Sequence, residues 1–285
     1  MRLRSLVLWD IRFQARYGFY FLYAVLTAIY VAVLSAVPEG WREKAAAILI
    51  FSDPASMGLF FMGAIVLLEK SQRTPWALAV SPVRAAEYIA AKVMSLSAIS
   101  LVAAAVLTAA AGVGAGVGAG VNAGDYGGVG AVAYGIADSC MVLLGTVLSS
   151  AVFTLLGIII ATRISSLNQF ILWTVPVELV CFVPAILHLF RVGSPLADGM
   201  SANPRGPVQI CMQTYTQTCT PGSSSAADAA AWLRYYPASV CMEMVSGQIP
   251  SSIGILMVMA LIGVLFVAAR YCVLNMWGRM GGGKL

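Results

Sequence analysis

Six apolar stretches of this chain are long enough to cross a lipid bilayer as helices. They cover residues 18–37, 54–68 with an extension at its inner end, 93–115, 135–161, 170–190 and 252–273. A crossing helix needs about 20 mostly apolar residues, and its internal hydrogen bonds satisfy the backbone inside lipid. The composition agrees, since 60% of the residues are hydrophobic and 10% are charged. We therefore expect an all-α polytopic membrane protein in which residues 1–285 form a single transmembrane domain.

The basic residues are distributed unevenly between the two sides that these spans define. With six spans, both termini lie on one side, and that side carries twelve of the 17 Lys and Arg residues. They are Arg2, Arg4, Arg12, Arg16, Lys70, Arg73, Arg84, Lys92, Arg163, Arg270, Arg279 and Lys284. Because cationic loops resist translocation, we expect a multi-pass protein of the inner or plasma membrane with both termini in the cytosol. This topology accounts for the net charge of +5 without a nucleic-acid partner.

Residues 1–17 precede the first span and have a helical pattern of their own. The apolar residues Leu3, Leu6, Val7, Ile11 and Phe13 stand against the polar residues Arg4, Asp10, Arg12 and Arg16. Such a stripe predicts a helix that lies in the inner membrane interface. A simple basic flank to the first span remains an alternative, and a signal peptide is a less favoured one.

Two carboxylates lie near or inside predicted spans. Ser52-Asp53-Pro54 has the pattern of a helix start, so Asp53 is either a structural cap or a residue of a transport path. Glu178 falls within the fifth span, where a carboxylate must be neutral, paired or beside water. It would either bind a cationic or zwitterionic substrate or bond a neighbouring helix.

The largest segment between spans, residues 191–251, is expected on the extracytoplasmic side with short helices in its second half. Cys211 and Cys219 lie eight positions apart in it, in a compartment that permits oxidation. We predict a disulfide between them, with Cys241 as the alternative partner.

The enzyme motifs sought in this sequence are incomplete or absent. Residues 278–284 match GxxxxGK, but Leu285 stands where a phosphate-binding loop has Ser or Thr. The chain has one histidine and no HExxH, CxxC or GxSxG pattern. We expect no catalytic residue, no metal site and no cofactor on this chain.

The cytosolic segment from Glu69 to Lys92 combines charges with a helix-start signal. Ser81 is suited to an N-cap and Pro82 to the first helical turn, with Arg84 and Glu87 on the exposed side after them. A compact charged segment between two spans suits docking to a soluble partner. An ordinary short connection is the alternative.

This segment resembles the membrane subunits of type-2 ABC exporters. In those proteins an acidic–basic pair, a Thr, an apolar stretch, a Pro, Glu-Tyr and a Lys follow the second span. The corresponding residues here are Glu69-Lys70, Thr74, Ala77 to Val80, Pro82, Glu87-Tyr88 and Lys92. Residues 51–54, 63–70 and 168–171 look most like the subgroup of drug, particularly fluoroquinolone, export permeases.

The resemblance implies a half-channel that pairs with a second permease subunit, identical or related, and with two copies of an ABC ATPase. ATP and Mg would bind the ATPase, and this chain would hydrolyse nothing. The residues that would couple to the ATPase are Glu69, Lys70, Arg73, Thr74, Pro82, Arg84 and Glu87. The second and fifth spans would line a path for a drug-like amphipathic substrate, with Asp53, Met57, Phe60, Phe61 and Glu178 on its wall.

Two alternatives stay open. One is a self-contained membrane protein, either a scaffold or a lipid-modifying enzyme. The other is an ABC exporter that carries a lipid or polysaccharide instead of a drug.

Overall fold

The computed structural model describes residues 2–75, 77, 81, 83–110, 136–192, 235–246 and 250–281. All secondary structure in this part of the chain is helical, and six of its helices are long and apolar enough to cross a membrane. The predicted all-α fold with six spans is confirmed. The chain is a multi-pass membrane protein.

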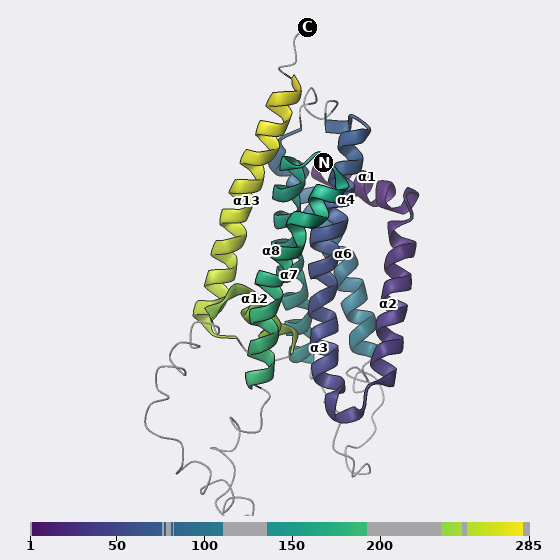
Figure 1. The fold of residues 1–285 in the computed structure, drawn as a ribbon, viewed down its shortest axis with the longest axis vertical. Helices are drawn as coiled ribbons and strands as arrows, with labels where there is room; N and C mark the ends of the chain where they lie inside the picture. Colours follow the sequence, from purple (N-terminus) through teal and green to yellow (C-terminus); the bar gives the residue numbers. More distant parts are fainter. Residues whose placement is uncertain are drawn as a thin grey trace, which may run out of the picture.

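The N-terminal helix α1 (Arg2–Arg16) precedes the first spanning helix, α2 (Phe19–Ala36). Gly18 joins them with a φ of 75°, a left-handed conformation that glycine adopts without strain. Figure 1 shows that α1 runs across the upper end of α2 instead of along the bundle. This orientation agrees with the predicted separate N-terminal helix.

The second span is one long helical stretch. It consists of α3 (Glu39–Ser56), a π-helix at Met57–Phe61 and α4 (Met62–Ser71). The predicted helix start at Ser52-Asp53-Pro54 is therefore wrong, because these residues lie inside α3. Pro removes one backbone donor from a helix, and membrane helices tolerate it where local π adjustments and neighbouring helices satisfy the freed groups.

The remaining spans are α6 (Ala85–Ala110), α7 (Ile136–Arg163), α8 (Leu167–Val192) and α13 (Ser252–Gly281). The third span starts earlier than predicted, at Ala85 instead of Val93. The short helix α12 (Pro237–Val245) agrees with the short helices expected before the last span, but its residues 239–245 are buried among the spanning helices.

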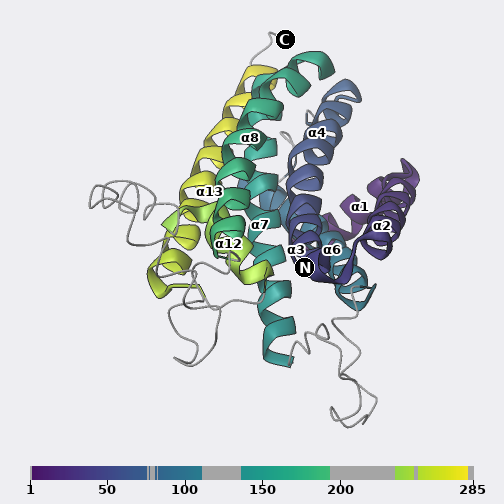
Figure 2. The ribbon, with the colours of Figure 1, turned by 60° about the horizontal axis from the view of Figure 1, so that its bottom comes forward.

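Helix α7 is the centre of the bundle, since it packs against α3, α4, α6, α12 and α13. A Cβ at Gly157 of α7 would lie 2.7 Å from the backbone oxygen of Gly58, so the absence of side chains lets α7 approach the π-helix closely. Helices α2 and α13 lie at opposite edges of the bundle (Figures 1 and 2). Helix α1 and the end of α13 lie at the same end (Figure 1).

Candidate functional site

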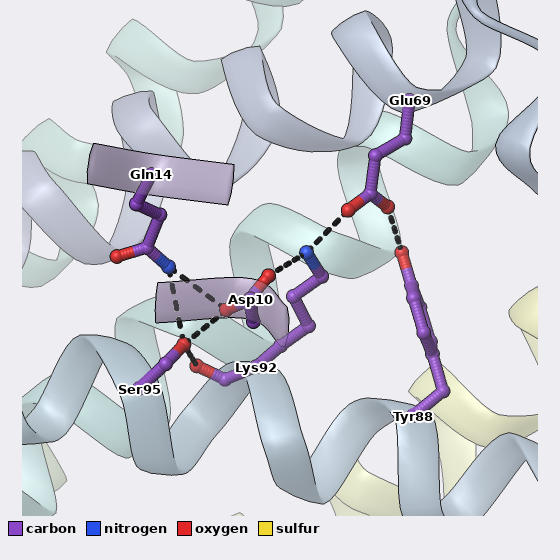
Figure 3. A network of polar contacts seen from close by, with 6 residues as sticks. All are labelled: Asp10, Gln14, Glu69, Tyr88, Lys92 and Ser95. Atoms are coloured by element: carbon purple, nitrogen blue, oxygen red, sulfur yellow. Dashed lines mark hydrogen bonds and ion pairs between the residues drawn. The ribbon is translucent and has the colours of Figure 1, made fainter. Parts of the chain in front are cut away.

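Three charged side chains from three helices meet at the α1 end of the bundle. Lys92 of α6 forms ion pairs with Asp10 of α1 and Glu69 of α4. Their side chains are 2%, 2% and 0% exposed, respectively, so all three are cut off from solvent. We call these residues, together with Gln14, Tyr88 and Ser95, the charged network (Figure 3).

Neutral donors complete the charged network. Tyr88 donates its hydroxyl hydrogen to Glu69 at 2.6 Å, and Ser95 donates to Asp10. Gln14 Nε2 donates to the carboxylate of Asp10 at 2.8 Å. These bonds matter because two carboxylates face one ammonium group, and a buried charge without partners costs several kcal/mol. The donors disperse the excess negative charge.

Helical spacing brings these side chains to one place. Tyr88, Lys92 and Ser95 lie at positions i, i+4 and i+7 of α6, so they share a face, and Asp10 and Gln14 lie at i and i+4 of α1. Figure 3 shows both sets pointing toward each other, with Glu69 approaching from α4. Asp10 was grouped from the sequence with the polar residues Arg4, Arg12 and Arg16, but α1 turns it toward α6, where it is buried.

This arrangement holds three helices together. Lys92 bonds two carboxylates, its Nζ lies 5.6 Å from the centroid of the Tyr88 ring, and its side chain is 2% exposed. No group of three His, Cys, Asp or Glu side chains that could hold a metal ion occurs in the described part of the chain. The charged network is therefore a mechanical link between α1, α4 and α6.

Three of the residues predicted to contact an ATPase have partners inside the chain. Glu69 belongs to the charged network. Lys70 Nζ donates to the carbonyl oxygens of Ala161, Thr162 and Ile164 at 2.6, 3.1 and 2.9 Å, so it caps the C-terminal end of α7. Glu87 accepts a hydrogen bond from the backbone N–H of Arg84 at 3.1 Å.

The helix start at Ser81-Pro82 is also wrong. Helix α6 begins at Ala85, and Glu87, its third residue, reaches back to the N–H of Arg84 just before the helix, which is half of a capping box. The helices leave residues 72–84 between them, a shorter connection than the predicted 69–92. Pro82 lies outside the described residues.

Arg73 and Arg84 keep exposed side chains in this connection, and Thr74 is half-buried. Arg73 has a φ of 57°, in the left-handed region, within the turn just after α4. Gln72 donates a hydrogen bond to the hydroxyl of Tyr17 at the end of α1. The connection is thus attached to the same three helices as the charged network, and two cations point out of it.

The residues predicted for a substrate path do not form one cluster. Asp53 and Met57 are buried, and Asp53 accepts a hydrogen bond from Tyr23 of α2. Phe61 packs near Met57, whereas Phe60 packs against a different apolar cluster, formed by α4, α6, α7, α8 and α13. Glu178 is half-exposed on α8, on a helix whose Trp173, Leu179 and Val180 are also exposed. Their role in transport stays a prediction.

A second buried pair lies at the opposite end of the bundle. His188 Nε2 of α8 lies 2.6 Å from Glu243 Oε1 of α12. Neither His188 nor Glu243 was predicted from the sequence as a site residue. Two sequence features indicated such a pair: the single histidine at the end of a span, and one carboxylate in the apolar run 238–245. The predicted disulfide stays a prediction, because Cys211 and Cys219 lie outside the described residues, and Cys241 is buried in α12.

Sequence reasoning also missed the charged network itself. Asp10, Glu69 and Lys92 were assigned to surfaces that meet the cytosol. A signal was present, since an acidic and a basic residue beside apolar helical segments must find partners if those segments are buried.

Comparison with known proteins supports the resemblance expected from the inner segment. Residues 1–123 match the fluoroquinolones export permease protein family. Fluoroquinolones export permease proteins of two Mycobacterium tuberculosis strains, CDC 1551 / Oshkosh and ATCC 25618 / H37Rv, are each 40% identical to this chain over 89 residues. The match covers 30% of this chain and 38% of each relative. All six residues of the charged network lie within the segment that matches the family. The N-terminal part of this multi-pass membrane protein is thus similar to the fluoroquinolone export permeases, as its sequence predicts.

Proposed function

We propose that this chain is the membrane-spanning permease subunit of an ATP-driven exporter of drug-like amphipathic molecules. The observation that carries the proposal is the match of residues 1–123 to export permeases, in a chain with six candidate spans. A second permease subunit, identical or related, completes the path, and two copies of a separate ATPase bind ATP and Mg. The protein resides in the inner or plasma membrane with the α1 end in the cytosol.

In this proposal, residues 72–84 contact the ATPase and the charged network passes the resulting movement to the bundle. Arg73 and Arg84 supply the contact, because their side chains are exposed, whereas Glu69, Lys70 and Glu87 are bonded within the chain. The connection joins α4 to α6, and Lys92 holds both to α1. A push on the connection therefore moves these three helices as one body, which is what a transition between two states of a transporter requires.

The substrate path lies between the two permease subunits, along the second and fifth spans. Phe60 and Phe61 are partly exposed on the π-helix, and Glu178 is half-exposed within α8. Aromatic side chains adapt to varied apolar ligands, and a carboxylate in the membrane interior attracts a cationic group. This combination suits amphipathic molecules with a positive charge.

The test is the double substitution Arg73→Glu with Arg84→Glu in the full chain, expressed in its own host. The matched control is Arg163→Glu, an exposed arginine at the end of α7, which changes charge at the same end of the bundle but outside the connection. We expect an ATPase to co-purify with the unmodified chain and with the control, and to be lost from the double variant together with fluoroquinolone efflux.

Folding of the double variant is checked by size-exclusion chromatography in mild detergent. A folded double variant that retains both the ATPase and efflux would disprove the docking assignment. Absence of any ATPase from a stable preparation of the unmodified chain would disprove the exporter proposal.

A further inference from the structure

An apolar groove lies between α1, α2 and α6, beside the charged network. Its cavity volume is about 700 Å³. Its lining residues are Ile11 of α1, six residues of α2 from Tyr20 to Val31 and six residues of α6 from Ser95 to Val106. None of them carries a formal charge.

The length of the groove corresponds to one leaflet of a bilayer. On α2 the lining runs from Tyr20 to Val31, and on α6 from Ser95 to Val106. At 1.5 Å per residue, each set covers about 16 Å. Half of the hydrocarbon core of a membrane measures about 15 Å. The groove therefore extends from the α1 end of the bundle to about the middle of the bilayer.

The groove is elongated, with a cavity volume of about 700 Å³ spread over a length of about 16 Å. It opens toward the membrane, because Val102 and Val106 on its wall are 62% and 46% exposed. A flexible hydrocarbon chain fits these dimensions.

The exposed charged side chains of α1 closest in sequence to Ile11 are positive. Arg12 and Arg16 are exposed on α1 within five residues of Ile11, about 8 Å along the helix. The acidic residue of α1, Asp10, does not offset them, since it is buried and paired with Lys92. Tyr20 and Ser95 also line the groove at this end.

We propose that this groove binds an anionic phospholipid of the leaflet at the α1 end. One acyl chain fills the space between α2 and α6, and the phosphate lies against Arg12 and Arg16. Ser95 lines the groove and also donates to Asp10, so the lipid contacts the face of α6 that carries the charged network. The lipid thereby holds α2 in place against α6. This binding site does not depend on the proposed transport function.

The first test uses the unmodified full chain in phosphatidylglycerol and phosphatidylcholine vesicles. Phosphatidylglycerol with a diazirine group in one acyl chain is photo-crosslinked to the protein, and the labelled residues are mapped by tandem mass spectrometry. Leu172 of α8 and Leu256 of α13 serve as internal controls, because both side chains are exposed and neither lines this groove. We expect labels concentrated at residues 24–31 of α2 and 98–106 of α6. Even labelling of α2, α6, α8 and α13 would overturn the proposal.

The second test fills the groove. Ala98→Phe places a ring in it, and Leu101→Phe, on a part of α6 that does not line the groove, is the matched control. Titration with phosphatidylglycerol by native mass spectrometry should show at least tenfold weaker binding of the first lipid to Ala98→Phe and no change for the control. Equal binding to both variants would disprove the site.

The third test addresses the headgroup. Arg12→Gln with Arg16→Gln should remove the preference for phosphatidylglycerol over phosphatidylcholine and retain the binding of the acyl chain. Arg163→Gln at the end of α7 is the control and should keep the preference. A preference that survives the double substitution would contradict the anionic specificity.

Discussion

At the α1 end of the bundle, three charged side chains from α1, α4 and α6 are buried together, whereas at the opposite end a single pair, His188 and Glu243, joins α8 to α12. The charged network is almost completely enclosed, while the side chains of His188 and Glu243 are each 10% exposed. In the network, one ammonium group serves two carboxylates on different helices. At the other end, each partner serves only one.

The difference shows which end depends most on a single residue. Removal of one partner from a buried ion pair leaves the other charge without compensation and costs about 3–5 kcal/mol. Lys92 compensates the carboxylates of Asp10 and Glu69. Its loss therefore leaves two buried charges unpaired, and each adds such a cost to the folded state. A pair with some access to water recovers part of the lost interaction through hydration. The two ends should therefore differ strongly in their response to equivalent substitutions.

Lys92→Met should have the largest effect. It keeps the length and apolar stem of the side chain but leaves Asp10 and Glu69 buried without a cation, and we expect a loss of at least about 3–5 kcal/mol of stability. The measurement is the amount of monodisperse protein in mild detergent and its midpoint of thermal unfolding. The triple variant Asp10→Asn, Glu69→Gln and Lys92→Met removes all three charges and should recover most of the loss. If the triple variant is as unstable as Lys92→Met, unpaired charge is not the cause.

Lys70→Met should have a smaller effect at the same end. It removes donors to three carbonyl oxygens at the end of α7, and hydrogen bonds to a charged group contribute about 1.5–3 kcal/mol each at most. Because water can reach these carbonyls from the connection, we expect a total loss of about 2 kcal/mol. Arg73→Met, three residues later on an exposed side chain, is the control and should change the unfolding midpoint little. Equal effects of the two substitutions would contradict the capping role of Lys70.

Glu243→Ala tests the opposite end and should cost about 1–2 kcal/mol, because it leaves one partly hydrated partner, His188, without its hydrogen bond. Glu243→Gln keeps an acceptor for the His188 ring and should lose less. Both are compared with Lys92→Met by thermal unfolding in the same detergent. A loss for Glu243→Ala as large as that for Lys92→Met would show that the two ends depend equally on their buried charges.

The spans were predictable from sequence because a helix in lipid needs a continuous apolar stretch of fixed length, which is a local property. The second span was the exception. Ser52-Asp53-Pro54 has the pattern of a helix start, but the structure continues through it, and Asp53 bonds Tyr23 on another helix instead of a free backbone N–H. The contact between Asp53 and another helix thus outweighed the local preference for a helix start.

The charged network was not predictable in the same way. Its two ion pairs connect residues 82 and 23 positions apart, and no spacing rule joins a carboxylate of the N-terminal helix to a lysine of the third span. The sequence shows that Glu69, Lys70 and Glu87 are charged residues near the membrane. It does not show whether their side chains point into the bundle or toward the cytosol. Burial depends on how α1 and α6 pack, and only the assembled bundle shows this. Arg73 and Arg84 are the two predicted coupling cations that remain exposed.

The smallest effect is expected at the boundary between the exposed connection and the buried network. Glu87 caps the start of α6 five residues before Lys92, and loss of such a cap costs about 0.5–1 kcal/mol. Glu87→Ala should therefore lower the unfolding midpoint only slightly, and Glu87→Gln, which keeps an acceptor for the Arg84 N–H, should lower it less. Hydrogen exchange sharpens the result, because fraying confined to residues 84–88 leaves the amides around Lys92 and Ser95 protected. If Glu87→Ala also deprotects these deeper amides, the start of α6 and the charged network unfold as a single cooperative unit. A movement of the exposed connection would then also move Lys92.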